Sequence, residues 1–245
     1  MTMVEQPNYN VFETKWIEEL LNAYEIDHIV KPSAQIVERY KDRLPEILVK
    51  FWIEKGWCSW SKGQYWICDP SIFQPVIDYV FLGDSELDPT RMVAFGYNAF
   101  GNVDIWYGDA TIRLNLPNGM VRVEPRGYDE GQKRQWTDEV MIGLKLSFNV
   151  SPYVAPWEDE KYQNMMPLAL ERIGQLEPGE IYGFAPALSI GGRNNVEHLQ
   201  KVKVPEHLLL LASLDSPTLY DYSPPSDGDG SLGAVTPRRK IGSAR

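Results

Sequence analysis

The sequence contains little cysteine, little histidine and no long apolar run. Two Cys in 245 residues do not make a disulfide framework. No apolar stretch approaches the roughly 18 residues that a membrane span needs. The first ten residues, MTMVEQPNYN, lack the basic start and apolar core of a secretory signal. These absences favour a cytoplasmic protein with free thiols and no membrane partner.

The three histidines give no metal-binding pattern. They are His28, His198 and His207, and neither a His-x-x-x-His pair nor a Cys-x-x-Cys pair of the kind that holds zinc occurs. We therefore expect no metal and no cofactor.

One stretch, residues 179–204 (GEIYGFAPALSIGGRNNVEHLQKVKV), resembles several catalytic motifs without completing any of them. Ser189 lacks the first Gly of the G-x-S-x-G elbow and has no acid and His in the required order. Gly191-Gly192 belongs to neither G-x-G-x-x-G nor a P-loop. The Gly pair is better interpreted as a turn with positive φ, followed by a capped helix. We predict no catalytic residue and no enzymatic activity.

Acidic residues outnumber basic ones, and the formal net charge is −10. Residues 223–245 sum to +2, so the remaining 222 residues sum to −12. Such a body repels nucleic acid, because phosphate binding requires a positive surface. It attracts a basic partner instead and speeds the encounter with it. Solubility alone also explains an acidic composition.

Hydrophobic periodicity predicts helices and strands without a regular alternation, which indicates the α+β class. We expect helices that flank a mainly antiparallel, mixed sheet. The predicted helices cover residues 9–24, 33–44 with Ser33 as N-cap, 45–56, 70–82 with an interruption near Pro75, 135–148, and 158–174 with a kink or break at Pro167. The predicted strands are a hairpin over 57–69, several strands between 91 and 125, and a buried final strand over 207–214. The Pro-, Gly- and Ser-rich residues 223–245 are predicted to be a disordered tail.

Three segments resemble the GAD-like family of bacterial type VI secretion immunity proteins. They are LPEILVKFWIEKGWCSWSKGQYWICDP, AFGNVDIW and GEIYGFAPALSIGGRNNVEHLQKVKVPEHLLLLASL, and they occur in the family's order over residues 30–215. The resemblance implies a GAD-related N-terminal subdomain (1–125), closely packed against a C-terminal immunity subdomain (126–222). It also implies an antidote that binds a co-encoded toxin, in the nearest relatives a DNA-degrading effector.

Two alternatives stay open at this point. The chain also resembles the broader SMI1/KNR4-like class of immunity and adaptor modules, which would bind another toxin class. An enzyme that reverses the damage done by the toxin is the second alternative.

The toxin-contact residues are predicted to be exposed aromatic and acidic side chains, because aromatics supply burial and acids complement a basic nuclease. The first cluster is on a strand end, the second in a Gly-flanked loop and the third before a helix. In that order they are Asp104, Trp106, Tyr107 and Asp109; Tyr128, Asp129 and Glu130; and Trp157, Glu158, Asp159 and Glu160.

Overall fold

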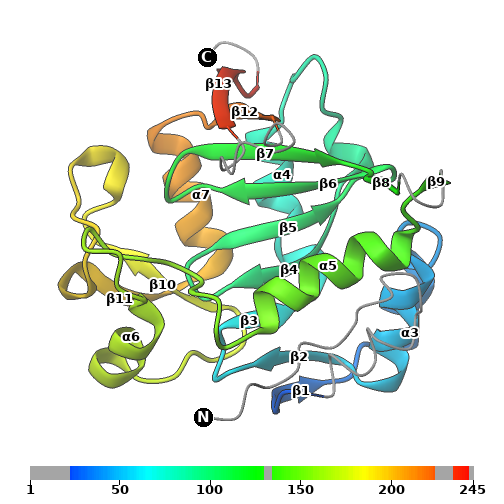
Figure 1. Ribbon diagram of the computed structural model, residues 1–245, viewed down its shortest axis with the longest axis horizontal. Coiled ribbons are helices and arrows are strands. Elements are labelled where there is room, and N and C mark those ends of the chain that lie inside the picture. The colour runs from blue at the N-terminus through cyan, green and yellow to red at the C-terminus, as the bar shows by residue number, and fades with distance from the viewer. Residues whose placement is uncertain (1–22, 130–133, 224–233, 243–245) are drawn as a thin grey trace.

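A computed structural model describes residues 23–129, 134–223 and 234–242. Within these residues, nine strands form one sheet in the order β1-β2-β3-β4-β5-β6-β7-β12-β13 (Figure 1). Every neighbouring pair is antiparallel except β7 and β12, which run parallel. The strands are β1 (Ile26–Val30), β2 (Trp57–Trp60), β3 (Tyr65–Ile67), β4 (Val93–Asn98), β5 (Asn102–Trp106), β6 (Ala110–Asn115), β7 (Met120–Pro125), β12 (Thr218–Ser223) and β13 (Ala234–Lys240). The predicted α+β class with a mainly antiparallel, mixed sheet is confirmed.

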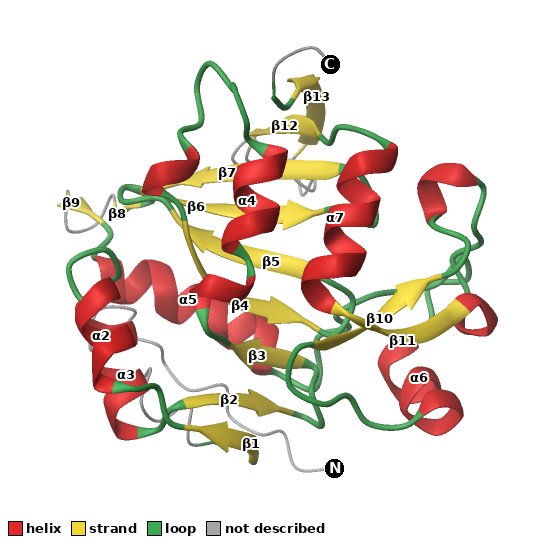
Figure 2. Cartoon of the chain, turned by 180° about the vertical axis from the view of Figure 1, so that it is seen from behind, coloured by secondary structure: helices red, strands yellow, loops and turns green. Residues whose placement is uncertain are grey.

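Helices cover both faces of this sheet. Helix α5 (Asp138–Val150) crosses one face, and α2 (Ala34–Tyr40) and α3 (Glu46–Glu54) lie near one end of it (Figure 1). Figure 2 shows α4 (Gln74–Val80) and α7 (Val204–Leu214) side by side across the other face. Each face has its own hydrophobic core, one beneath α3 and α5 and one beneath α4 and α7. Side chains that alternate along a central strand are therefore buried in both directions.

Local signals in the sequence account for several helix ends. The Ser33 side chain accepts a hydrogen bond from the Ile36 backbone amide and caps α2. Pro45 precedes α3, and Gly56 follows it with φ +99°. Thr137 caps α5, since its hydroxyl accepts from the amide of Val140.

A smaller unit lies beside the main sheet. It contains the antiparallel pair β10 (Glu180–Phe184) and β11 (Leu199–Lys203) together with α6 (Met165–Ile173) (Figure 1). The Tyr182 amide donates to the carbonyl of Ala99, 2.8 Å away, which ties β10 to the end of β4. A two-stranded pair, β8 (Tyr128–Asp129) and β9 (Arg134–Gln135), precedes α5. The 3₁₀ helices are η1 (Pro70–Ile72), η2 (Pro89–Arg91), η3 (Leu188–Ile190) and η4 (Val196–His198).

The two halves of the chain share a core. Phe100, from the N-terminal half, stacks on Trp157 with ring centroids 5.9 Å apart and also contacts Tyr182. This packing agrees with closely packed subdomains, while the boundary at residue 125 remains a prediction. No helix among the described residues is both long and apolar enough to cross a bilayer.

Two sequence-based expectations were wrong in part, and a third is not tested. Residues 207–214 belong to α7, a helix, because a short apolar run does not distinguish a buried strand from a buried helix. Helix α6 begins at Met165, after the Asn164 cap, so Pro167 lies in its first turn and causes no kink. The expected helix over 9–24 lies almost wholly outside the described residues.

The expectation of a disordered tail over 223–245 was also wrong for its described part. Residues 234–240 form β13, which pairs antiparallel with β12. Arg239 donates to both carboxylate oxygens of Asp84, at 2.6 and 2.8 Å. The Asp84 side chain is fully buried, so a cation from the C-terminal segment satisfies an acid 155 residues earlier in the chain.

Candidate functional site

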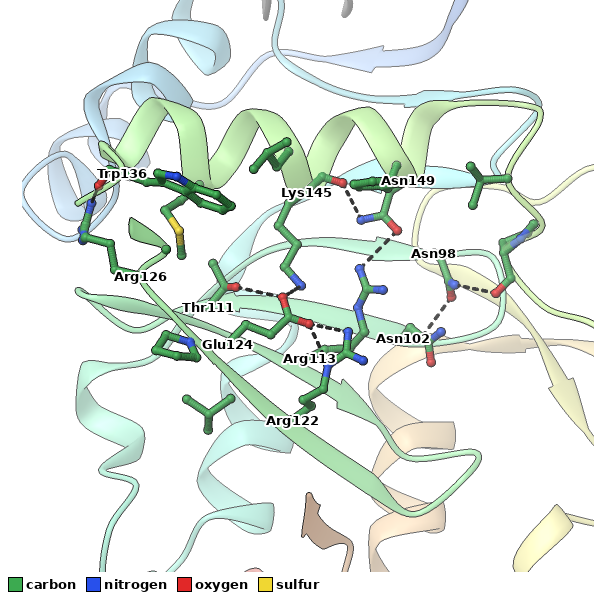
Figure 3. Close-up of a pocket in the computed structure, with 18 of the residues that line it drawn as sticks. Asn98, Asn102, Thr111, Arg113, Arg122, Glu124, Arg126, Trp136, Lys145 and Asn149 are labelled. Atoms are coloured by element: carbon green, nitrogen blue, oxygen red, sulfur yellow. Dashed lines mark hydrogen bonds and ion pairs between the residues drawn. The ribbon is translucent and has the colours of Figure 1, made fainter. Parts of the chain in front are cut away.

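A groove of about 960 Å³ opens between α5 and the strands β4 to β7 (Figure 3). We call it the α5 groove. It is lined by Asn98, Asn102, Thr111, Arg113, Arg122, Val123, Glu124, Pro125, Arg126, Gly127, Trp136, Met141, Leu144, Lys145, Phe148, Asn149, Val154, Ala155 and Pro156. Its volume is at the upper end of the range that small-molecule pockets occupy.

The floor of the groove is anchored by a buried carboxylate. Asp104 on β5 is 1% exposed and faces Arg113 on β6, which donates from Nε at 3.0 Å and from a terminal guanidinium nitrogen at 3.2 Å. The Tyr65 hydroxyl, at 3.1 Å, and the Asn149 amide, at 3.0 Å, donate to the same carboxylate. Every Asp104 oxygen therefore has a partner, as a buried charge requires.

A second carboxylate joins α5 to β7. Lys145 reaches down from α5 to form an ion pair with Glu124 (Figure 3), and its Nζ also lies 3.6 Å from Asp104. Glu124 accepts in addition from Nε of Arg122 at 2.8 Å. The network thus holds three cations, Arg113, Arg122 and Lys145, against two carboxylates.

Burial and charge act in opposition on these groups. Burial raises the pKa of Asp104, but the charges of Arg113 and Lys145 outweigh it and hold the pKa below its ordinary value. The pKa of Glu124 is lowered in the same way, by Lys145 and Arg122 against the effect of burial. Burial lowers the pKa of Lys145, and the neighbouring carboxylates only partly offset this. Both carboxylates are therefore ionised at neutral pH.

A glycine makes room for one of these contacts. A side chain at Gly96 on β4 would place its first carbon 2.2 Å from the Tyr65 hydroxyl and 2.8 Å from the backbone carbonyl of Trp66. Only a residue without Cβ fits there, and the Tyr65 hydroxyl can then reach Asp104. Burial raises the pKa of Tyr65 well above its ordinary value, so this hydroxyl stays a donor.

The walls and the rim of the groove are apolar. Trp136, Met141 and Leu144 contribute to its lining. Phe148 and Val154 also line it, and they are 64% and 39% exposed. Tyr153, next to Val154 in the chain, is 90% exposed. Exposed aromatic and aliphatic side chains beside a pocket mark surfaces that bind other molecules.

The structure does not bring the first predicted contact cluster to the surface. Asp104, Trp106 and Tyr107 are buried, so the expectation that they form an exposed strand end was wrong. Only Asp109 of this cluster is exposed. The reason is that β5 lies inside a sheet that helices cover on both faces.

The third predicted cluster is divided. Trp157 is buried, stacks on Phe100 and donates from its indole nitrogen to Asn194 at 2.8 Å, so it is not an exposed contact. Glu158 and Glu160 are exposed, and Asp159 is half-buried. The Asp159 carboxylate accepts from the amides of residues 161 and 163 and so shapes the turn.

The second predicted cluster is only partly within the described residues. The backbones of Tyr128 and Asp129 form β8, while their side chains and all of Glu130 lie outside what the structure describes. Whether this cluster contacts a toxin stays a prediction.

The Gly pair of the 179–204 stretch forms a turn, as predicted. The capped helix expected after it was wrong, because the three-residue η4 leads directly into strand β11 and Asn195 makes no side-chain cap hydrogen bond. Gly191 has φ +92° and ends η3. A Cβ on Gly192 would lie 2.0 Å from the carbonyl oxygen of Pro186, so this turn excludes a side chain. Ser189 lies within η3, and His198 pairs with Asn195 at 2.6 Å.

Sequence reasoning missed the cationic floor of the α5 groove, although a signal for it was present. In the hairpin of β6 and β7, alternation places Ile112, Leu114, Val121 and Val123 on one face. By alternation, the opposite face carries Thr111, Arg113, Arg122 and Glu124. Two cations at alternate positions of one hairpin, with an acid beside them, indicate a polar cluster under a helix.

Comparison with known families shows what the two halves of the chain resemble. Residues 15–118 match the model of the GAD-like domain, and residues 147–215 match that of the T6SS immunity protein Tdi1, C-terminal. The predicted resemblance to GAD-like type VI secretion immunity proteins is confirmed by these two matches. The second match supports an immunity role. No curated protein matches the chain.

One solved structure shares the fold over nearly the whole length. The crystal structure of Atu4351 from Agrobacterium tumefaciens superposes with a TM-score of 0.76 at 25% sequence identity. The match covers 93% of this immunity protein and 98% of that chain. The arrangement of both halves is therefore common to the two proteins.

Residues 119–146 lie between the two family matches. They include β7 and most of α5, and they supply 10 of the 19 residues that line the α5 groove. The groove is thus built largely from the part of the immunity protein that neither family model describes.

Proposed function

We propose that this immunity protein neutralises a cognate type VI secreted toxin by forming a stoichiometric complex with it. The toxin is a basic nuclease domain that degrades DNA, and the complex forms in the cytoplasm. The net charge of −10 on a chain that matches an immunity protein family carries this proposal. A nuclease presents a basic surface to DNA, and an acidic partner is attracted to that surface.

Exposed acids supply the long-range attraction. Asp109, Glu158 and Glu160 are the exposed acids among those predicted contact residues whose side chains the structure describes. Nucleic acid itself is not a partner, because the same charge repels phosphates. Neutralisation by binding needs no catalytic residue, no metal and no cofactor.

A titration of nuclease activity tests the proposal. The toxin used is the product of the effector gene next to that of the immunity protein. The purified toxin is incubated with plasmid DNA and increasing amounts of immunity protein. Binding predicts that the remaining DNA cleavage falls in proportion to added protein and reaches its minimum at about one equivalent. Full protection at a small fraction of an equivalent would instead indicate an enzyme that reverses the damage.

The same experiment separates the toxin classes. One outcome is a toxin that leaves DNA intact and still forms a complex with the immunity protein. In that case the antidote role stands, but the assignment as a nuclease inhibitor is overturned. An SMI1/KNR4-like module that binds another toxin class gives that outcome.

A further inference from the structure

The α5 groove is a built feature that neutralisation by surface acids leaves unused. Its floor is a closed network of ion pairs. Buried ion pairs add little net stability compared with apolar packing of the same volume, so stability alone does not explain them. Arg113, Arg122 and Lys145 nevertheless lie together at the base of an open depression.

The charge of this network is opposite to that of the whole molecule. Among the residues that the structure describes, three cations face two carboxylates, so this part of the network carries an excess of one positive charge within a protein of net charge −10. A single carboxylate from a partner matches this excess. A polyphosphate such as DNA carries many negative charges, and the surrounding acidic surface repels it.

The rim of the groove has the composition of a binding hot spot. Phe148 and Tyr153 are large, rigid and mostly exposed, and Val154 lies between Tyr153 and the lining residue Ala155. Aromatic and Arg side chains around a pocket dominate the energy of protein–protein interfaces. Figure 3 shows Lys145 reaching Glu124 from α5 and Arg122 reaching it from the same strand, β7, with Trp136 at one end of the groove.

The groove lies largely between the segments that carry the two family matches. More than half of its lining comes from residues 119–146, outside both matches. A toxin contact at this place leaves the two matched segments free to build the scaffold.

From these observations we infer that the α5 groove is the docking site of the cognate toxin. It accepts a toxin segment in which a carboxylate side chain lies between apolar side chains. The carboxylate pairs with Arg122 and its cationic neighbours, while the apolar flanks cover Phe148 and Tyr153. This inference rests on the proposed function, because the occupant is the toxin that the protein neutralises.

Substitutions at the rim and the floor test the inference. The dissociation constant of the toxin complex is measured for the unchanged protein, for Phe148→Asp and for Arg122→Glu. Leu210→Asp is the matched control, since Leu210 is a 53% exposed apolar residue on α7, on the opposite face of the sheet. Phe148 is largely exposed, so its variant keeps the test valid even if Arg122→Glu fails to fold.

We expect both groove variants to weaken toxin binding by at least about 30-fold, as loss of a hot-spot residue does, while Leu210→Asp changes it less than about twofold. Binding by the unchanged protein together with unaltered binding by Phe148→Asp would overturn the inference and leave the proposed function intact. No binding by the unchanged protein would overturn the proposed function itself.

A second arm distinguishes a toxin segment from a small anion. Melting temperatures of the unchanged protein and of Arg122→Glu are measured with inorganic phosphate and with adenosine monophosphate at millimolar concentration. Toxin docking predicts no melting shift that depends on Arg122. A shift that Arg122→Glu abolishes, together with unaltered toxin binding by the groove variants, would make the groove a small-anion site and overturn the inference.

Discussion

Asp104 and Arg113 lie directly opposite each other on β5 and β6 and form a two-point ion pair. The carboxylate is almost wholly buried, while the guanidinium opens toward the α5 groove. The pair thus links the core of the sheet to the surface that we assign to the toxin.

Removing the charge of Asp104 should destabilise the fold strongly. Asp104→Asn leaves Arg113 and Lys145 buried beside each other without their shared acid, and breaking a buried pair costs about 3–5 kcal/mol. Urea unfolding measures the loss. Asp109→Asn is the control, because this exposed acid should change stability by less than about 0.5 kcal/mol. A loss at Asp104 no larger than at Asp109 would contradict the role of the network.

The C-terminal strand should contribute to stability through one arginine. Arg239→Gln removes charge-assisted hydrogen bonds to buried Asp84, which should cost about 2 kcal/mol in urea unfolding. Its neighbour Arg238 is the control, since it forms an exposed pair with Glu86 that is worth much less. Equal effects of Arg238→Gln and Arg239→Gln would show that β13 is not held by the Asp84 pair.

This strand also shows where sequence reasoning fails. Residues 234–240 have few apolar side chains to bury, so composition alone predicted disorder. Their order comes from pairing with β12 and from a partner 155 residues away, and no local pattern encodes either contact. Local signals worked where the cause is local, as at Ser33 and Pro45.

The strand β5 shows a second limit. Asp104 and Trp106 were expected to be exposed because they were placed at the end of a strand. They lie two residues apart and therefore point to the same face of β5. In a sheet covered on both faces, that face lies under α5, and a charged residue there is neutralised by partners from other elements. The sequence holds the charges, but only the fold shows that they meet.

Acidification should weaken the fold through His207. Burial lowers the pKa of this imidazole, so the folded state disfavours the protonated form. The unfolded chain binds the proton more readily, and stability is therefore lost as pH falls through about 6.5 toward the folded-state pKa. Unfolding of the unchanged protein and of His207→Gln is compared at pH 7 and pH 5. We expect a smaller loss in the variant; an identical loss would exclude His207 as its source.

Exposed acids near the turn at 158–160 should speed encounter with a basic toxin. The Glu158→Lys/Glu160→Lys variant leaves Asp159 intact, because that side chain shapes the turn. Its association rate at low salt should fall by about tenfold, and the difference should shrink at high salt. Glu54→Lys/Glu171→Lys makes the same change in net charge on exposed helical sites. If both double variants slow association equally, net charge and not this cluster steers the toxin.

Hydrogen exchange of the immunity protein, alone and with one equivalent of toxin, tests neutralisation by binding most directly. Complex formation at the α5 groove predicts slower exchange in residues 138–156 while DNA is protected. Unchanged exchange throughout the immunity protein, with DNA still protected, would contradict neutralisation by binding.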